Sequence, residues 1–435
     1  MSGIKRLIIA CLGSLMIIFY GCNLKQENAF KAKKENLLPI QYALSMFDDD
    51  LEVDSLILAI ERNLDYLEKL DPQRLFQYGP HQFTCQQVFE SQIAFLQIIS
   101  LNKNPRNWAK KIKNQFLVYE VSNSVNRKKV LFTGYYEPII SASMSKNADF
   151  QHPIYKKPED LIRLNLSKFK SSLSGESIMV MVEGKTVQPY YSREKIDMGK
   201  ALKGRGLELA WLRDPIDVIF LHIQGSGRLK FPDGRIVPVG YSATNGRPYR
   251  SIGRYLLKKG YLSKAQMSMQ NIRKFLTENP MRLNETLSYN PSYIFFQVKQ
   301  NGPLGNINVR ITPGRSIALD SKLFPKGALC FISCKKPIIN KHQEITDWTD
   351  FSRFALNQDT GGAIKGYYRA DLFFGSSAYA ELAAGNLKHK GRLYVLIKKP
   401  SAQASNEYKP IIRKSIDRYL SQSDVNGFRS PVHQF

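Results

Sequence analysis

The chain has 435 residues, with 63 lysines and arginines against 37 aspartates and glutamates, which gives a net charge of +26 at pH 7. This length is sufficient for two domains and additional segments. Such a positive excess suggests an anionic partner, either a nucleic acid, a membrane surface or an acidic polymer. The basic residues are spread along the chain, and no basic helix, zinc-finger spacing or aromatic RNA-binding strand accompanies them, so we expect no nucleic-acid partner.

Residues 1–21 have the pattern of a signal peptide. Two basic residues precede an apolar stretch, residues 7–20, that is too short for a comfortable membrane span, and Gly21 and Cys22 follow. This order is typical of a bacterial lipoprotein, which is cleaved before its cysteine and lipidated on it. We therefore expect Cys22 to anchor the protein at the periplasmic side of the outer membrane. An ordinary secretory signal and an uncleaved anchor are the alternatives.

The cysteine and histidine content argues against metal and redox chemistry. Besides Cys11 and Cys22, the five cysteines include Cys85, Cys330 and Cys334. The last two lie in one β-like run, which would hold them too far apart for a disulfide. The six histidines are scattered, and neither a His-Glu-x-x-His nor a paired Cys-x-x-Cys motif is present. We expect no metal and no cofactor.

The chain after the signal begins polar and then becomes helical. Residues 22–45 are polar and rich in lysine, as expected for a tether. Leucines and isoleucines between residues 51 and 70 recur at spacings near three and four, which predicts a helix, and residues 88–101 predict another. These helices form an expected α-helical N-terminal part.

Strand patterns follow from Val130 onward. Residues 307–311, 328–333 and 391–398 are predicted to be strands. Residues 401–435 are polar with scattered charges, which predicts a disordered, basic tail.

Polar and aromatic side chains concentrate in three stretches, residues 189–193, 218–228 and 240–253. The second is predicted to be a buried apolar strand that delivers Gln224 into a turn of small residues where a ligand can approach the backbone. It lacks the spacing of a phosphate-binding loop. Tyr, Asn, Gln and Arg side chains on loops suit a sugar polymer, because aromatic rings stack on pyranose rings and amides bond hydroxyls. The alternative is that these loops are polar only because they face solvent.

Two carboxylates, Asp359 and Asp371, flank a glycine-rich turn at Gly361 and Gly362. The alternation that follows the turn places Asp371 on the same strand face as Arg369. A neighbouring negative charge raises the pKa of a carboxyl group, which keeps its proton on near neutrality, as protonation of a glycosidic oxygen requires. The alternative is that both aspartates cap loops.

Six motifs then occur in a fixed order. They are Thr-Gly-Tyr-Tyr-Glu-Pro at 133–138, Pro-Tyr-Tyr-Ser-Arg at 189–193, Gln-Gly-Ser-Gly at 224–227, Tyr-Arg-Ser-Ile-Gly at 249–253, Asn-Pro-Ser-Tyr with two phenylalanines at 290–296, and the stretch 359–375. With these motifs the sequence resembles the membrane-bound lytic murein transglycosylase A family, whose C-terminal part is called the three-aspartate domain.

The resemblance implies a fold and a division into domains. The fold would be mainly β with an α-helical N-terminal part. A double-psi β-barrel domain, residues 46–138 and 300–400, would be interrupted by a smaller inserted β domain, residues 139–299, and the glycan would bind in a groove between them.

The resemblance also implies roles for single residues. Asp371 matches the catalytic acid and base of the family, and Asp359 and Asp320 match its companions. The remaining substrate-binding candidates are Gln224, Gly225, Ser226, Tyr241, Asn245, Tyr249, Gly361, Gly362 and Lys365.

The implied activity is cleavage of the β-1,4 bond between N-acetylmuramic acid and N-acetylglucosamine in peptidoglycan, with formation of a 1,6-anhydro ring. The expected partners of this monomer are the glycan strand, the membrane and proteins of cell-wall synthesis or division. Hydrolysis of the same bond, a non-catalytic peptidoglycan-binding lipoprotein and a basic lipoprotein that tethers partner proteins are the alternatives.

Overall fold

The computed structural model describes residues 36–40, 47–101, 108–122, 128–300 and 302–400. The predicted signal, Cys22, most of the predicted tether and the predicted tail at 401–435 lie outside the described residues. None of the helices in the described part is long and apolar enough to cross a bilayer.

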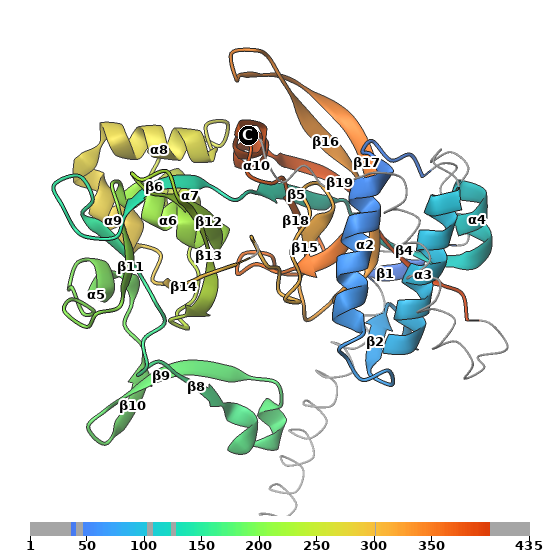
Figure 1. The fold of residues 1–435 in the computed structure, drawn as a ribbon, viewed down its shortest axis with the longest axis horizontal. Coiled ribbons are helices and arrows are strands. Elements are labelled where there is room, and N and C mark those ends of the chain that lie inside the picture. The colour runs from blue at the N-terminus through green and yellow to red at the C-terminus, as the bar shows by residue number, and fades with distance from the viewer. Residues whose placement is uncertain (1–35, 41–46, 102–107, 123–127, 301, 401–435) are drawn as a thin grey trace, which may run out of the picture. The chain divides into compact units, whose positions relative to one another are not determined.

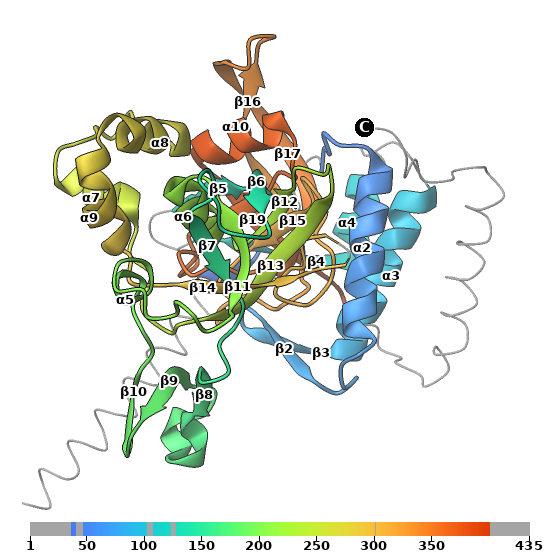
Figure 2. The same ribbon diagram turned by 60° about the vertical axis from the view of Figure 1, so that its left-hand side comes forward.

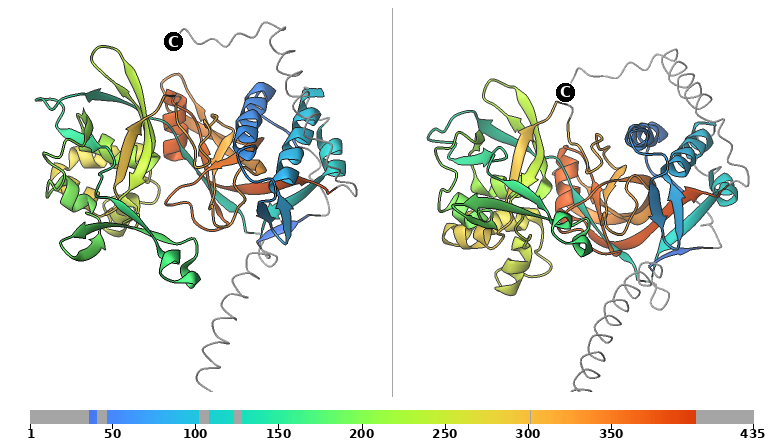
Figure 3. Two further views of the ribbon diagram at one scale, coloured as in Figure 1. Left: turned by 60° about the horizontal axis from the view of Figure 1, so that its bottom comes forward. Right: turned by 90° about the horizontal axis from the view of Figure 1, so that it is seen from below.

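An eight-stranded sheet contains the strands from both ends of the described chain, in the order β1-β4-β19-β16-β17-β15-β18-β5. Its strands are β1 (Leu37–Pro39), β4 (Phe116–Val121), β5 (Val130–Tyr135), β15 (Ser316–Ala318), β16 (Leu329–Ile339), β17 (Ile345–Asp359), β18 (Arg369–Phe373) and β19 (Lys388–Lys398). Because β19 also pairs with β5, six of these strands close into a barrel. Figure 3 shows the barrel strands from two directions. The expected mainly β fold is confirmed.

The two faces of β16 explain how the barrel is built. Cys330 and Ile332 lie in one apolar core together with residues of β5, β18 and β19, whereas Leu329 and Phe331 lie in another with residues of the N-terminal helices. This is the alternation of a strand buried on both faces, and it accounts for the continuous apolar run in the sequence. Cys85, Cys330 and Cys334 are buried free thiols.

Helices cover the outer face of the barrel. The N-terminal ones are α2 (Val53–Leu67), α3 (Cys85–Leu101) and α4 (Trp108–Gln115), and α10 (Ala378–Asn386) precedes β19. Between α2 and α3 lies a hairpin of β2 (Leu75–Tyr78) and β3 (His81–Thr84). The buried positions of α2 recur at helical spacing and face β17 and α3 (Figure 1).

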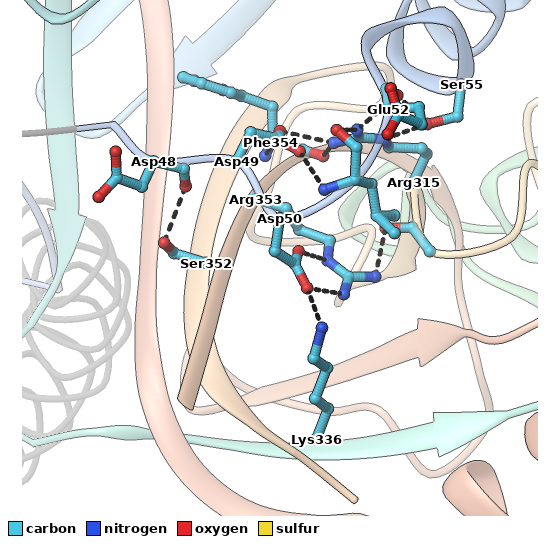
Figure 4. Close-up of polar contacts among 12 residues, drawn as sticks. Asp48, Asp49, Asp50, Glu52, Ser55, Arg315, Lys336, Ser352, Arg353 and Phe354 are labelled. Atoms are coloured by element: carbon cyan, nitrogen blue, oxygen red, sulfur yellow. Dashed lines mark hydrogen bonds and ion pairs between the residues drawn. The ribbon is translucent and has the colours of Figure 1, made fainter. Parts of the chain in front are cut away.

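The segment before α2 is fastened to the barrel by three ion pairs (Figure 4). Asp49 accepts a bond from Arg315 at 2.6 Å, and both side chains are 0% exposed. Arg353 donates from Nε and NH2 to the two oxygens of Asp50, at 2.7 and 2.8 Å, and Lys336 donates to Asp50 at 2.6 Å. We call these five side chains the N-terminal clamp.

The clamp is closed by further hydrogen bonds. Arg315 donates to Ser55 Oγ and to the backbone carbonyls of Leu51, Glu52 and Phe354. A buried ion pair stabilises a fold only when its remaining donors and acceptors are satisfied, and here they are. The clamp therefore joins the start of α2 to β17 and to the loop before β15.

Residues between β5 and β15 form a second, six-stranded sheet, in the order β14-β13-β12-β6-β11-β7. Its strands are β6 (Ile139–Ser143), β7 (His152–Tyr155), β11 (Glu208–Leu212), β12 (Ser226–Lys230), β13 (Ile236–Thr244) and β14 (Ile294–Val298). The helices are α5 (Arg193–Asp197), α6 (Pro215–Gln224), α7 (Ile252–Lys258), α8 (Met269–Glu278) and α9 (Leu283–Ser288), with a 3-10 turn, η4 (Pro280–Arg282).

A three-stranded sheet belongs to the same region. It consists of β8 (Ile162–Asn165), β9 (Ser177–Glu183) and β10 (Thr186–Pro189), with the 3-10 turns η2 (Leu166–Lys168) and η3 (Ser171–Leu173) between β8 and β9. Figure 2 shows these strands as a small sheet of their own.

Two stretches differ from the sequence prediction. Residues 307–311 were predicted to be a strand and instead form a turn, in which Asn308 has φ 58°. Their alternating apolar side chains are buried all the same, so the pattern reports burial rather than strand geometry. Leu37–Pro39, within the predicted tether, form β1 and pair with β4, and Leu37 is buried.

Candidate active site

Parallel pairing of β18 with β5 places Asp371 beside Thr133. Thr133 Oγ1 donates a hydrogen bond to Asp371 Oδ1 at 2.8 Å, and Arg369 NH2 donates to Thr133 Oγ1 at 3.3 Å. Arg369 and Asp371 therefore share a strand face, as predicted, and the threonine hydroxyl connects them. Within the described residues, neither Asp371 nor Asp359 forms an ion pair.

Asp359 is the last residue of β17 and is held by three hydrogen bonds. Tyr135 OH donates to Oδ2 at 2.9 Å, and the backbone N–H groups of Asn306 and Thr360 donate to Oδ1 at 3.1 and 2.8 Å. Tyr135 lies two residues after Thr133 on β5, so one strand face supplies a hydroxyl to each carboxylate.

The two carboxylates have unusual protonation behaviour. Burial raises the pKa of Asp371 to about 6; the Thr133 bond and Arg369 oppose this rise, and the charge of Asp359 adds to it. Burial also raises the pKa of Asp359 to about 6, against its hydrogen bonds. A carboxyl group with a pKa near 6 is half protonated near that pH, which suits it to donate a proton and later to accept one.

The loop after β13 brings Tyr249 to this site. Burial raises the pKa of Tyr249, and the nearby charge of Asp371 contributes to the rise. A side chain added at Gly362 would place its Cβ 3.8 Å from Tyr249 Cβ. Tyr249 and the glycine turn therefore flank the acid. Gly361 lies in the same turn, and Lys365 is exposed three residues after Gly362.

Gln224 is placed differently from the prediction. The predicted strand before it is the helix α6, and Gln224 is its last residue. Its Oε1 accepts a hydrogen bond at 2.9 Å from the backbone N–H of Tyr136, just after β5. Gly225 ends the helix with φ 77°, and Ser226 begins β12. Gln224 thus joins the end of α6 to the chain just after the strand that supplies Thr133.

The strand prediction failed because α6 is apolar on nearly every side. Val218 and Leu221 pack against the six-stranded sheet, while Ile219 and Phe220 pack against α7 and α8. A helix buried on two faces loses its amphipathic period and resembles a buried strand. The signals that identify it are at its ends, where Asp214 caps the first turn before a proline and a glycine follows the last residue.

Asn245 and Tyr241 have contrasting surroundings. The Asn245 amide donates to the carbonyls of Tyr191 and Pro291 and accepts from the N–H groups of Arg247 and Tyr293, so its whole bonding capacity holds the loop that carries Tyr249. Tyr241, on β13, is 50% exposed and free to meet a ligand.

Asp320 forms hydrogen bonds with backbone groups of the fold. Its carboxylate accepts hydrogen bonds from the backbone N–H groups of Lys322, at 3.1 Å, and Gly366, at 2.8 Å. It therefore fixes the far end of the loop between Asp359 and Asp371. Across the part of the chain that the structure describes, no three His, Cys, Asp or Glu side chains are grouped to hold a metal ion.

Thr133 and Tyr135 lie in the first of the six sequence motifs, but the sequence pattern indicated no role at the site for either of them. The sequence did contain one indication, the spacing of these two residues, because residues two apart on a strand share a face. Recognising their partners requires the pairing of β5 with β18, which are 238 positions apart at the hydrogen bond to Asp371.

Comparison with known proteins shows which family the chain belongs to. The family model described as the MltA specific insert domain matches residues 131–297, and the 3D domain model matches residues 315–397. Over 287 residues the chain is 31% identical to membrane-bound lytic murein transglycosylase A of Escherichia coli strain K12, covering 65% of this chain and 70% of that protein. The chain belongs to the membrane-bound lytic murein transglycosylase A family.

Solved structures of this family share the fold. A membrane-bound lytic murein transglycosylase from Agrobacterium tumefaciens has a TM-score of 0.66 at 27% identity, covering 85% of this chain and 95% of that one. MltA from Neisseria gonorrhoeae has a TM-score of 0.61 at 29% identity, covering 81% and 90%. E. coli MltA with bound chitohexaose has a TM-score of 0.61 at 24% identity, covering 84% and 96%.

Proposed function

We propose that this protein is a lytic transglycosylase that cleaves the β-1,4 bond between N-acetylmuramic acid and N-acetylglucosamine in peptidoglycan and leaves 1,6-anhydromuramic acid ends. Family membership supports the substrate class. The observation that carries the chemistry is Asp371, which receives a hydrogen bond from Thr133 and forms no ion pair within the described residues, and whose pKa burial raises to about 6.

Asp371 acts first as the acid. Its proton passes to the glycosidic oxygen as the bond from that oxygen to the muramyl C1 breaks. The C6 hydroxyl of the same muramyl residue then attacks C1, and its proton returns to the Asp371 carboxylate. Because the attacking hydroxyl belongs to the substrate, no second carboxylate is needed to activate water or to act as a nucleophile.

Asp359 and Thr133 tune this acid from opposite directions. The charge of Asp359 favours the protonated form of Asp371, while the bond from Thr133 favours the carboxylate. The proton is thus held strongly enough to be present near pH 6 and weakly enough to be transferred. Asp359 is the supporting carboxylate, and Asp320 supports the loop through its backbone bonds.

The glycan strand binds along the surface that Tyr249, Tyr241 and the glycine turn provide. Tyr249 flanks the acid, Tyr241 presents an exposed ring, and the exposed Lys365 lies on the same loop as the two aspartates. The chitohexaose bound to the E. coli relative, a chain of β-1,4-linked N-acetylglucosamine, supports a glycan ligand. Gln224, Gly225, Ser226 and Asn245 shape this surface through the backbone they hold.

The domain division and the membrane anchor expected from the sequence belong to the same proposal. The closed barrel is a double-psi barrel formed by residues 46–138 and 300–400, and residues 139–299 are an inserted domain that lines the glycan groove. Residues 1–21 are a lipoprotein signal, Cys22 carries the lipid at the outer membrane, and residues 22–45 include the tether. Pairing of β1 with β4 supports an end of the tether before Leu37.

Digestion of purified peptidoglycan tests the activity. Muropeptides released by the protein are weighed by mass spectrometry, and the proposal requires products one water lighter than those of hydrolysis. Products with ordinary reducing ends would make the protein a hydrolase. Firm binding to sacculi with no released product would make it a non-catalytic peptidoglycan-binding lipoprotein.

A further inference from the structure

A small pocket of about 240 Å³ lies at the end of β18, the strand that carries the candidate acid. Phe373 lines it and lies two residues after Asp371 on β18, on the same strand face. The ring of Phe373 packs on that of Tyr135 at 5.2 Å, and Tyr135 in turn holds Asp359. One aromatic layer therefore separates the pocket from the two carboxylates.

Three arginines from three separate segments line the pocket: Arg62 from α2, Arg228 from β12 and Arg310 from the turn before β15. Most of their N–H donors have no partner among the residues that the structure describes. Arg62 donates through NH1 alone, to Thr312 Oγ1 at 2.8 Å and to nearby carbonyls. Arg228 donates through Nε, and the Arg310 side chain makes no hydrogen bond within the described residues.

The pocket is electrically unbalanced. Glu137 is the one carboxylate among its lining residues; it is 2% exposed and accepts from Arg228 at 2.8 Å. Three guanidinium groups against one carboxylate leave a net charge of +2 at the lining. Burial and the neighbouring Arg310 lower the pKa of Arg62, although Glu61 and Asp65 act in the opposite direction. Among the residues that line the pocket, the guanidinium groups therefore outnumber the carboxylates.

The size and the donors together indicate the ligand. Pockets for drug-sized ligands have volumes of about 300–1,000 Å³, so this one suits a single small group rather than a run of sugars. Guanidinium forks match the two oxygens of a carboxylate. In peptidoglycan the muramyl residue carries a lactyl ether that ends in a carboxylate, either free or extended by a peptide, whereas N-acetylglucosamine carries none.

We propose that the pocket of Arg62, Arg228 and Arg310 binds the carboxylate of the muramyl substituent. This inference rests on the proposed function and adds a recognition element to it. It explains how an enzyme that acts on a polymer of alternating sugars can set the register of the strand. An anion held in a pocket at the end of the strand that carries Asp371 distinguishes the muramyl residue from its neighbour. The carboxylate can be that of the lactyl group itself or that of the attached peptide.

Arg310→Gln is the variant of choice, because this exposed side chain makes no bonds that the fold needs. Its KM for glycan strands is compared on three substrates: strands with peptides, strands stripped of peptides, and stripped strands whose lactyl carboxylates have been converted to amides. We expect KM to rise roughly 5- to 20-fold, with kcat unchanged, on the carboxylate-bearing strands and to be unaltered on the amidated ones. The carboxylated substrate that shows the larger rise identifies the source of the anion.

Arg235→Gln is the matched control, since it removes one positive charge from an exposed arginine paired with Asp233 outside the pocket. An equal rise in KM for this control, or for the amidated strands, would overturn the proposal. So would an unchanged KM for Arg310→Gln on every substrate.

A binding measurement separates this inference from the proposed activity. Chemical shifts of the full protein are followed on titration with N-acetylmuramic acid, N-acetylmuramyl dipeptide, N-acetylglucosamine and inorganic phosphate. The muramyl ligands should bind and lose affinity in Arg310→Gln, even if the protein proved to have no lytic activity. Binding of phosphate alone, or equal binding of N-acetylglucosamine, would contradict the carboxylate site.

Discussion

The protein contains two sets of aspartates with opposite surroundings. In the N-terminal clamp, Asp50 meets Arg353 and Lys336; burial alone would raise its pKa, but the two cations outweigh burial and lower it. In the candidate active site, Asp371 meets a threonine hydroxyl and a second carboxylate, and burial raises its pKa to about 6. The same side chain is thus a permanent anion in one place and a proton carrier in the other.

The difference shows how the chain separates stability from chemistry. A carboxylate with close cations and satisfied hydrogen bonds joins segments and cannot give up a proton near neutrality, because it holds none. A carboxyl group without such a partner destabilises the fold when it ionises. It therefore keeps its proton to a higher pH and can transfer that proton to a substrate. Substitutions at single residues can alter one side of this contrast at a time.

The largest effect is expected from Asp371→Asn on catalysis. The amide cannot donate the proton to the glycosidic oxygen, so the rate of anhydro product release should fall roughly 10²- to 10⁴-fold. Initial rates on purified sacculi, measured with binding to the same sacculi, check this. Asp50→Asn is the comparison, and the folded fraction of that variant should keep its lytic rate. A loss of less than tenfold in Asp371→Asn would remove Asp371 from the mechanism.

Arg315→Ala breaks the clamp and should have the largest effect on stability. It leaves Asp49 buried without its cation, which costs about 3–5 kcal/mol of the free energy of unfolding. Urea denaturation measures the change. Replacing Asp49 and Arg315 together by leucine and methionine removes the unpaired charge, and this double variant should recover much of the loss. A single variant as stable as the parent would show that the clamp has no role in holding the N-terminal segment.

Asp371→Asn should also stabilise the fold, in a pH-dependent way. An unfolded aspartate releases its proton near pH 4 and folded Asp371 near pH 6, so the folded state binds more protons between these values. Parent stability therefore falls as the pH rises from about 4 to about 6 and stays lowered above that. The variant avoids this loss, and its free energy of unfolding should exceed that of the parent by roughly 1–2 kcal/mol near pH 7.5, with no gain near pH 3.5.

Asp50→Asn gives the opposite sign in the same experiment. The lowered pKa of Asp50 stabilises the fold above the unfolded pKa and ceases to do so as the pH falls through the folded value. The variant should therefore be less stable than the parent near pH 7.5. If both variants changed stability in the same direction, the contrast between the two carboxylate environments would be incorrect.

The smallest effect is expected from Thr133→Val. It removes the hydrogen bond that favours the carboxylate form of Asp371, so the pKa of Asp371 should rise. The decline of lytic rate at alkaline pH should then move upward by roughly half a pH unit. The pH dependence of kcat/KM measures this shift, and a downward shift would exclude the threonine as a donor to the acid.

The local sequence pattern predicted the two acids but not the residues that surround them. Alternation along residues 369–373 correctly placed Asp371 on the face of Arg369, since both lie within one strand. Thr133 and Tyr135 could not be linked to the acids because the pairing of β5 with β18 joins segments far apart in the chain. The clamp was missed for the same reason, as Asp49 and Arg315 are 266 positions apart.

Other differences between prediction and structure arise in buried segments, where the spacing of apolar residues no longer distinguishes a helix or a turn from a strand. Residues 218–223 were predicted to be a strand because α6 is buried on two faces, and residues 307–311 because a turn buries every second side chain. Asn245 was predicted to meet the ligand, yet its amide is fully used by backbone groups. A polar residue on a loop cannot be assigned to a ligand or to the fold without the positions of its partners.

The most direct measurement is the titration of Asp371 itself. Carboxyl carbon resonances of the ¹³C-labelled protein are followed between about pH 2.5 and 8, with Asp371 and Asp50 assigned by the signals that disappear in Asp371→Asn and Asp50→Asn. We expect a midpoint near 6 for Asp371 and one below the ordinary aspartate value for Asp50 in the same spectra. A midpoint for Asp371 at or below 4 would mean that it is ionised at working pH, and would contradict its role as the proton donor.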